Sequence, residues 1–330
     1  MLPMPPAGLL LADLYAPVAE ELAVVERRFD DELYSESPFV NGLCQCVQRY
    51  RGKMLRPTLL LLSGKTCGPL TDEHVTLAAV VEMVHVATLV HDDVLDEAQV
   101  RRKQATINAT NGNETAVLLG DYLISHAFHL CSGLDDQYAS RLIGATTNTV
   151  CEGELLQVRH RANAELTEGE YLEIIRRKTA ALTGACCALG ARYAGALPQA
   201  TGQWERFGTD LGMAFQIIDD VLDCVGSEQQ MGKTLGRDLD LGEPTLPTIH
   251  ALHHASAAVR RALASVLSNG HAVSRKTIRG WLEQAGSIEY AYRSAAEYVA
   301  LAGKHLEPLA QSLAKDALLA VTDFVLRRRH

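Results

Sequence analysis

Apolar residues recur at helical spacing along nearly the whole chain, and no stretch alternates apolar and polar residues long enough to predict a strand. The pattern predicts an all-α fold. Because no linker divides the sequence, we expect one large helical bundle over residues 1–330. The predicted helices lie at 9–30, 38–49, 55–66, 72–98, 112–132, 136–160, 168–197, 201–226, 244–267, 273–283 and 286–326, the last broken near Pro308.

Helix starts and one long loop can be assigned from local signals. "TEGE" at 167–170 predicts a capping box, and "TDEH" at 71–74 predicts a similar start. The polar stretch "SEQQMGKTLGRDLDLGE" at 227–243 contains three glycines and mixed charge. We expect it to be a mobile loop over a functional site.

Two similar acidic clusters each follow an apolar segment: "HDDVLD" at 91–96 and "IIDDVLD" at 217–223. Residues four apart lie on one face of a helix, about 5.4 Å along its axis. Asp92 and Asp96 are therefore expected to point the same way, as are Asp219 and Asp223. The alternative is a solvated acidic helix end, which the repetition of the motif disfavours.

The two clusters are expected at helix ends that flank a central cavity. Facing carboxylates repel strongly in a low-dielectric interior, so they need cations. Ligation by aspartate oxygens alone suits Mg²⁺, which keeps several waters and often bridges to a substrate phosphate. Facing helices of a bundle can supply such ligands. The sequence therefore predicts a site for magnesium and a diphosphate.

Basic residues accompany both clusters. Guanidinium groups match phosphate oxygens, and lysine supplies a point charge. "RGKMLRP" at 51–57 is expected to open a helix with Lys53 and Arg56 one turn apart. The other candidates are Arg101 and Arg102 after the first cluster, Lys178 and Thr179 in "RRKTA", Lys233 and Arg237 in the 227–243 stretch, and His85, two turns before Asp92.

Composition narrows the class of protein. The net charge of −9 argues against a nucleic-acid binder. The eight cysteines show neither C-x-x-C nor zinc-site spacing, so we expect free, mostly buried thiols in a reducing cytoplasm. The N-terminal "MLPMPPAGLLLADLY" lacks the basic region of a signal peptide. The apolar run before residue 91 contains Glu82 and His85, so we expect it to be too short and too polar to span a bilayer. A soluble, cytoplasmic protein is expected.

Taken in order, these motifs resemble the trans-isoprenyl diphosphate synthases, also called polyprenyl synthetases. The resemblance covers residues 50–255, and the first acidic region is similar to that of long-chain, octaprenyl-type enzymes. It is carried by "GKMLRP", "EMVHVATLVHDDVLDEAQVRR", "VLLGDYLISHAF", "CEGELLQ", "RRKTA", "FQIIDDVLD" and "GKTLGRDLDLGEPTLPTIHAL".

The resemblance implies a role for each matching residue and a homodimer. We also expect no nucleic-acid partner, given the net charge, and a product that is passed to membrane enzymes. Roughly three Mg²⁺ ions per site are implied with substrate bound. The implied main metal ligands are Asp92, Asp96 and Asp219, with Asp93, Asp220 and Asp223 supporting. The implied contacts of the allylic diphosphate are Arg101, Lys178, Thr179, Gln216 and Lys233. Those of isopentenyl diphosphate are Lys53, Arg56, His85 and Arg102.

The implied reaction is a head-to-tail condensation. Magnesium and arginines stabilise the charge on the leaving diphosphate as the allylic C–O bond breaks. The double bond of isopentenyl diphosphate attacks the resulting cation, and a proton is lost to the departing diphosphate. Since water would quench the cation, the pocket must be apolar, and the 227–243 stretch is expected to close over it.

The chain departs from the family pattern at several positions. In the usual "GGKRxRP", Arg51 replaces a glycine and Met54 an arginine. In the usual "RRGxPT", Lys103 replaces the glycine and Ala105 the proline. Glu243 replaces a lysine near the end of the 227–243 stretch, which bears on diphosphate affinity there.

Three other functions compete with this interpretation. A class I terpene cyclase has a different second motif and many aromatic residues, whereas this chain has 5%. A non-catalytic subunit of a heteromeric synthase usually lacks intact acidic motifs. A helical metal-dependent phosphohydrolase does not account for His85 beside two basic sets.

The helix before Asp92 is expected to line the pocket for the growing product. Ala87 and Thr88, five and four residues upstream, are small, and Met83, Val84 and Val80 lie below them. Short-chain members of the family carry a bulky aromatic at this level. With about one isoprene unit per helical turn, the predicted product is roughly C30 to C50; a farnesyl or geranylgeranyl product is the alternative.

The first test of this pocket is Ala87→Phe, which is expected to shorten the product by blocking the pocket at that level. Thin-layer chromatography of the products reports the length. An unchanged length distribution would contradict the pocket assignment.

Overall fold

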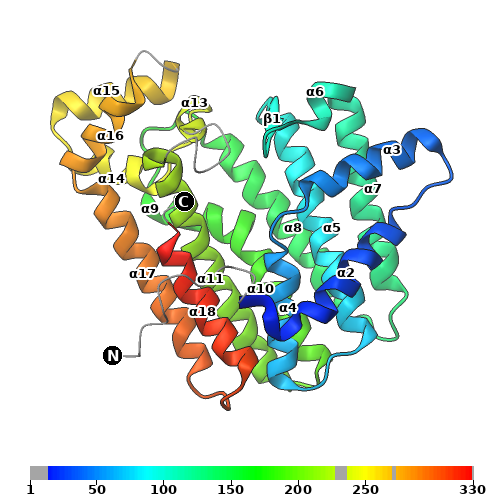
Figure 1. The fold of residues 1–330 in the computed structure, drawn as a ribbon. Helices are drawn as coiled ribbons and strands as arrows, with labels where there is room; N and C mark the ends of the chain where they lie inside the picture. Colours follow the sequence, from blue (N-terminus) through cyan, green and yellow to red (C-terminus); the bar gives the residue numbers. More distant parts are fainter. Residues whose placement is uncertain (1–13, 227–235, 270–272, 329–330) are drawn as a thin grey trace. The chain divides into compact units, whose positions relative to one another are not determined.

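A computed structural model of the chain describes residues 14–226, 236–269 and 273–328 (Figure 1). Two-residue strands β1 (Val100–Arg101) and β2 (Gln104–Ala105) form one small hairpin, and the other regular elements of the described residues are helices. The all-α prediction is confirmed. All eight cysteines are free, and four of them are buried: Cys44, Cys131, Cys186 and Cys187.

The chain divides into two compact units. The first comprises Met1–Thr147, Leu182–Gly208 and Gly303–Val321. Its elements include β1 and β2 together with η1 (Ala16–Val18), α2 (Ala19–Glu32), α3 (Pro38–Val47), η2 (Gln48–Tyr50), α4 (Leu55–Cys67), α5 (Asp72–Leu95), α6 (Ile107–Asn111), α7 (Asn113–Ser132) and nearly all of α10 (Ala181–Tyr193). The single domain over 1–330 stays a prediction.

The second unit comprises Asn148–Ala181, Thr209–Ala302 and Thr322–His330. Its elements include α9 (Glu168–Ile175), the π-helical segment η3 (Arg176–Ala180), α13 (Arg237–Asp240), α14 (Leu246–His254), α15 (Ala257–Asn269) and α16 (Arg275–Gln284). Four further helices contribute residues to both units: α8 (Tyr138–Arg159), α11 (Pro198–Val225), α17 (Ser287–Leu306) and α18 (Leu313–Arg327).

Helix α5 is central to the core of the first unit. Its start at Thr71 carries the capping interaction that "TDEH" predicted, with the ring of His74 in the third position. Among the described helices α5 is long and apolar enough to cross a membrane, but 78% of its apolar window is buried inside the protein. Burying each large aliphatic side chain contributes about 1.5–3 kcal/mol, which explains why so apolar a helix packs inward.

One face of α5 remains half-exposed. His85, Thr88, Leu89, Asp92 and Asp96 follow one another at helical spacing and are partly accessible. The neighbouring α7 packs closely against the same helix: a Cβ at Gly120 would lie 2.2 Å from Nε2 of His91. The end of α5 that carries the first acidic cluster is therefore supported on one side and accessible on another.

The structure corrects two helix assignments. The helix predicted at 244–267 is two helices, because Ala255 adopts an extended conformation and the Ser256 hydroxyl accepts the N–H of Val259. Lys53 lies outside α4, since Met54 takes a left-handed conformation at φ 51° and the helix begins at Leu55. The expectation that Lys53 and Arg56 share a helical turn is wrong.

The hairpin after α5 was not anticipated. Val100 pairs with Ala105 and Arg101 with Gln104, which leaves Arg102 and Lys103 as a two-residue turn. Both turn residues have positive φ, 51° and 65°, as a type I′ turn requires. Non-glycine residues are strained there, so the hairpin that carries Arg101 and Arg102 stores backbone strain.

Lys103→Gly should relieve part of this strain. Glycine adopts positive φ freely but loses more entropy on folding, so we expect a net gain of about 0.5–1 kcal/mol in the free energy of unfolding. Urea denaturation measures the change. The matched control is Gln104→Gly in strand β2, which should lose about 0.5–1 kcal/mol. A loss of stability in Lys103→Gly as large as in the control would contradict the strain.

Candidate active site

The first acidic cluster lies at the C-terminal end of α5. Asp92 occupies the last turn, and Asp96 is the residue at the helix C-cap. The backbone N–H of Asp96 donates to the carbonyl of Asp92 at 2.8 Å, so helical geometry continues through the motif. Both side chains are half-exposed. The two residues therefore stand one turn apart, as the spacing predicts.

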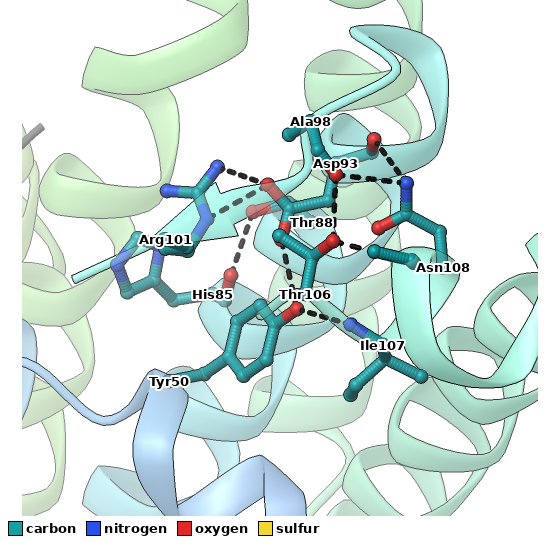
Figure 2. Close-up of polar contacts among 10 residues, drawn as sticks. Tyr50, His85, Thr88, Asp93, Ala98, Arg101, Thr106, Ile107 and Asn108 are labelled. Atoms are coloured by element: carbon teal, nitrogen blue, oxygen red, sulfur yellow. Dashed lines mark hydrogen bonds and ion pairs between the residues drawn. The ribbon is translucent and has the colours of Figure 1, made fainter. Parts of the chain in front are cut away.

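Asp93 differs sharply from its two neighbours. It is 1% exposed. Its Oδ1 accepts a hydrogen bond from Nε of Arg101 at 2.9 Å and lies 2.9 Å from Nη2 of the same guanidinium (Figure 2). Its Oδ2 accepts the hydroxyl proton of Tyr50 at 2.8 Å. Both carboxylate oxygens are thus engaged by the protein.

A network around Asp93 fixes the end of α5 to the start of α6. The Tyr50 hydroxyl accepts the backbone N–H of Ile107 at 3.1 Å, and burial raises its pKa, so it stays protonated and donates to Asp93. The amide of Asn108 donates to the carbonyls of Asp93 and Ala98 at 3.1 and 3.0 Å (Figure 2). The strained hairpin lies between the end of α5 and the start of α6, so these hydrogen bonds set its position.

Two of the predicted isopentenyl diphosphate ligands, Arg56 and Arg102, lie near a third, His85. Burial, followed by the charges of Arg56, Arg102 and Arg101, holds the pKa of His85 well below its usual value. The imidazole is therefore neutral, and the three arginines lie close enough to act on it. Arg102 also donates to the carbonyl of Tyr50 at 2.8 Å. Lys53 is exposed just before α4.

Arg101 and Glu82 show how charge is balanced in this cluster. Burial disfavours the charged form of Arg101, but the hydrogen bond and the charge of Asp93 outweigh burial and raise its pKa. Glu82 is 1% exposed, and burial raises its pKa against the opposing charges of Arg56 and Arg102. It is a buried acid set among guanidinium groups.

The second acidic cluster repeats the arrangement around Asp93. Asp220 is 5% exposed, and its Oδ2 accepts the hydroxyl proton of Tyr171 at 2.6 Å. Its Oδ1 accepts the amide of Gln216 at 2.7 Å, and Gln216 in turn accepts the hydroxyl of Thr179 at 2.9 Å. Burial raises the pKa of Asp220 to about 7 despite these two donors. Thr179 and Gln216, predicted to share a ligand, lie in one chain of hydrogen bonds.

The other two aspartates of this cluster have different neighbours. Nη1 of Arg328, at the end of α18, lies 2.8 Å from Oδ1 of Asp219. Asp223 accepts the backbone N–H of Asp238 at 3.4 Å, and its carbonyl accepts the N–H of Gly236 at 3.1 Å. The described end of the 227–243 stretch is thus attached to the motif. Lys233 lies outside the described residues.

Lys178 is presented by the π-helical segment η3, a feature common at functional sites. Its ammonium lies 2.8 Å from Oε2 of Glu154 on α8. A Cβ at Gly153 would come within 2.4 Å of the backbone N of Lys178, so a glycine is required for this close approach. In this structure Lys178 is paired with a carboxylate of the chain.

Two departures from the family pattern gain a structural reason. The guanidinium of Arg51 lies 2.9 Å from Oδ1 of Asp30 and 5.2 Å from the centre of the Phe29 ring, so it ties the "RGKMLRP" segment to α2. Glu243 is 7% exposed and accepts Nε of Arg161 at 2.8 Å, and it also accepts the amide of Gln157. Its carboxylate is neutralised within the fold.

The donor atoms suit magnesium. The cluster residues are all aspartates, and Oδ1 of Asp219 is a buried carboxylate oxygen that makes no hydrogen bond among the described residues. In the part of the chain that the structure describes, no group of three or more His, Cys, Asp or Glu side chains converges on one point. A metal held here would therefore complete its shell with waters and substrate oxygens, as Mg²⁺ commonly does.

A model of the polyprenyl synthetase family matches residues 38–282. This chain belongs to the polyprenyl synthetase family. It is therefore a prenyltransferase, in a family that elongates prenyl chains. A Rhodobacter capsulatus protein described as all-trans-nonaprenyl-diphosphate synthase (geranyl-diphosphate specific) is 36% identical over 96% of this chain and 97% of its own length.

Two further relatives are similar over most of the chain. A short chain isoprenyl diphosphate synthase from Methanothermobacter thermautotrophicus is 36% identical over 84% of this chain and 87% of its own. The crystal structure of polyprenyl synthase from Caulobacter crescentus, complexed with calcium and isoprenyl diphosphate, has a TM-score of 0.93 at 29% identity, over 99% of this chain and all of that one.

Four residues that bond or pair with predicted site residues were not themselves predicted from the sequence: Tyr50, Tyr171, Glu154 and Arg328. Tyr50 directly precedes the "RGKMLRP" motif, and Glu154 lies within "CEGELLQ", so the family segments could have pointed to both residues. Tyr171 and Arg328 stand outside any of the quoted motifs, and no local pattern marks them.

Tyr50→Phe tests the network around Asp93. Removing the hydroxyl leaves a buried carboxylate oxygen without its donor, so we expect a loss of about 1–3 kcal/mol in the free energy of unfolding. The control is Tyr34→Phe, because Tyr34 is 68% exposed and should change stability by less than about 0.5 kcal/mol. Equal stabilities of the two variants in urea denaturation would show that the Asp93 network contributes nothing.

Proposed function

We propose that the chain is a magnesium-dependent trans-polyprenyl diphosphate synthase that joins isopentenyl diphosphate head-to-tail to an allylic diphosphate. The proposal rests on the side chains at the C-terminal end of α5 and on the charged groups near them. Asp92 and Asp96 occupy the accessible face of α5, and the electrostatic neighbours of His85 on that face are Arg56, Arg101 and Arg102. Metal ligands and diphosphate ligands thus belong to one cluster.

Each part of the cluster has a role in the proposed reaction. Bound magnesium would offset the charge that develops on the allylic diphosphate as its C–O bond breaks. Arg101, anchored by Asp93, presents a guanidinium to that diphosphate. Arg56, Arg102 and the neutral ring of His85 hold isopentenyl diphosphate, whose double bond forms the new carbon–carbon bond. The proton lost in that step goes to the departing diphosphate.

The second unit contributes a parallel set of groups. We assign Asp219 and Asp223 as metal ligands, Lys178, Thr179 and Gln216 as diphosphate contacts, and Lys233 as a further contact from the 227–243 stretch. Asp93 and Asp220 are assigned to positioning as well as to the metal, because each is buried and bonded to a tyrosine. The calcium and isoprenyl diphosphate of the Caulobacter structure support a divalent cation and a diphosphate as ligands of this fold.

The proposed product is a long prenyl chain of roughly C30 to C50, with about one isoprene unit per helical turn. Similarity alone does not set this length, since a nonaprenyl and a short-chain synthase are both 36% identical to the chain. The residues before Asp92 carry the argument. Thr88 lies on the half-exposed face of α5, whereas Ala87, Val84 and Met83 are at most 1% exposed.

We further propose a homodimer that works in the cytoplasm and delivers its product to membrane enzymes. The dimer follows from the family resemblance, and the membrane step follows from the chemistry of the product, a long apolar chain with a charged head.

The activity is tested by incubating the purified full chain with Mg²⁺, labelled isopentenyl diphosphate and geranyl, farnesyl or geranylgeranyl diphosphate. Incorporation of label into longer prenyl diphosphates is expected. Release of hydrocarbon alone would indicate a terpene cyclase, and release of phosphate alone a phosphohydrolase. Asp92→Asn should lose at least about a hundredfold in kcat, because it removes a charged ligand of the metal.

Thr88→Phe is a sharper test of chain length than Ala87→Phe. Thr88 is accessible, so the aromatic ring extends into the space before Asp92, whereas a ring at the buried Ala87 position must first displace packed side chains. We expect a shorter product by reversed-phase chromatography. Thr88→Ser is the control, because serine keeps the hydroxyl that donates to the carbonyl of His85 at 2.7 Å. Identical product lengths in the two variants would refute the assignment of this face.

A further inference from the structure

An arginine at the end of the last helix lies on the second acidic cluster. Nη1 of Arg328 is 2.8 Å from Oδ1 of Asp219, and the guanidinium carbon lies 4.2 Å from the centre of the Phe215 ring. The side chains of Arg328 and Asp219 are only 16% and 26% exposed. Phe215 is one turn before Asp219 on α11, so the guanidinium is stacked on a ring and faces a carboxylate of the same helix.

This ion pair is unlike the other contacts of the acidic clusters. Nη1 of Arg328 and Oδ1 of Asp219 are buried atoms that make no hydrogen bond within the described residues, so charge and stacking hold the pair. Asp93, by contrast, accepts hydrogen bonds from Arg101 and Tyr50. Charge-assisted hydrogen bonds are the strong ones, so the Asp219 pair is the easier of the two to separate.

A divalent cation that binds Asp219 through Oδ1 takes the oxygen that Arg328 faces. A carboxylate oxygen lies about 2.0–2.1 Å from a bound Mg²⁺. A guanidinium nitrogen cannot remain at its present distance on the same side of that oxygen, and the two positive charges repel at such a separation. Metal binding at this oxygen and the present position of Arg328 are therefore mutually exclusive.

We propose that Arg328 is a built-in counter-ion of Asp219 and that a divalent cation displaces it by binding Oδ1. The arginine neutralises the partly buried carboxylate while no metal is bound, and it weakens metal binding by the substrate-free protein. The inference rests on the proposed role of Asp219 as a metal ligand. It assigns Arg328 a positioning role, since it acts on the metal through Asp219.

The test measures Mn²⁺ binding to the substrate-free full chain by isothermal titration calorimetry and by the loss of the free-ion EPR signal. Arg328→Gln is expected to bind Mn²⁺ about three- to tenfold more tightly than the unmodified protein, because the competing cation is removed. The matched control is Arg327→Gln. Arg327 carries the same charge at the same helix end but faces Asp323 at 3.9 Å and is 46% exposed. Its affinity should change by less than about twofold.

A second variant covers the case in which Arg328→Gln does not fold. Phe215→Leu removes the ring beneath the guanidinium without changing charge, and a smaller gain in Mn²⁺ affinity is expected. Equal Mn²⁺ affinities of Arg328→Gln and Arg327→Gln would overturn the counter-ion role. If Arg328→Gln does not fold, an unchanged Mn²⁺ affinity of Phe215→Leu would overturn it instead. If Asp219→Asn binds Mn²⁺ as the unmodified protein does, Asp219 is not a metal ligand, and that part of the proposed function fails together with this inference.

Discussion

Repulsion between neighbouring carboxylates is the constraint that shapes both acidic clusters. Each cluster places three aspartates within five consecutive residues. In each, the second aspartate is buried and accepts a hydrogen bond from a tyrosine hydroxyl of another element, Tyr50 for Asp93 and Tyr171 for Asp220. The remaining charge is handled differently. Arg101 balances Asp93, whereas burial raises the pKa of Asp220 to about 7. The parallel use of a tyrosine indicates that fixing the second carboxylate is a common requirement of the two motifs.

Fixing Asp93 also orders the residues that follow it. The hairpin turn at Arg102 and Lys103 is strained, and such strain persists only where the surroundings determine the backbone. Here the Asp93–Arg101 pair holds the residue before the turn, and the bond from Arg102 to the Tyr50 carbonyl holds the first turn residue. Two guanidinium groups are thereby held in place, which would reduce the entropy lost if they bind diphosphate as proposed. The backbone strain is located in the turn, where a glycine at position 103 would lower it.

Local signals in the sequence predicted local structure well. The Thr167 capping box is present, with Thr167 and Glu170 bonded reciprocally, because it depends on residues three apart. The spacing of Asp92 and Asp96 held for the same reason. Contacts between distant residues were missed: Tyr50 and Tyr171 lie 43 and 49 positions from their aspartates. The break at Ala255 was missed because no glycine or proline marks it, and the left-handed conformation of Lys103 follows from strand pairing that sequence periodicity did not reveal.

The two arginines that contact the acidic clusters are held by different interactions. Arg101 meets Asp93 through two nitrogens, one in a hydrogen bond, and that carboxylate is also bonded to Tyr50. Separating this pair would strand a buried charge, so the pair is expected to persist when substrate binds. Arg328 meets Asp219 without a hydrogen bond and rests on an aromatic ring. An incoming cation replaces its charge on the carboxylate, so the exchange leaves no buried charge unbalanced. In the proposed function, Arg101 therefore stays paired with Asp93, whereas Arg328 leaves Asp219 when the cation binds.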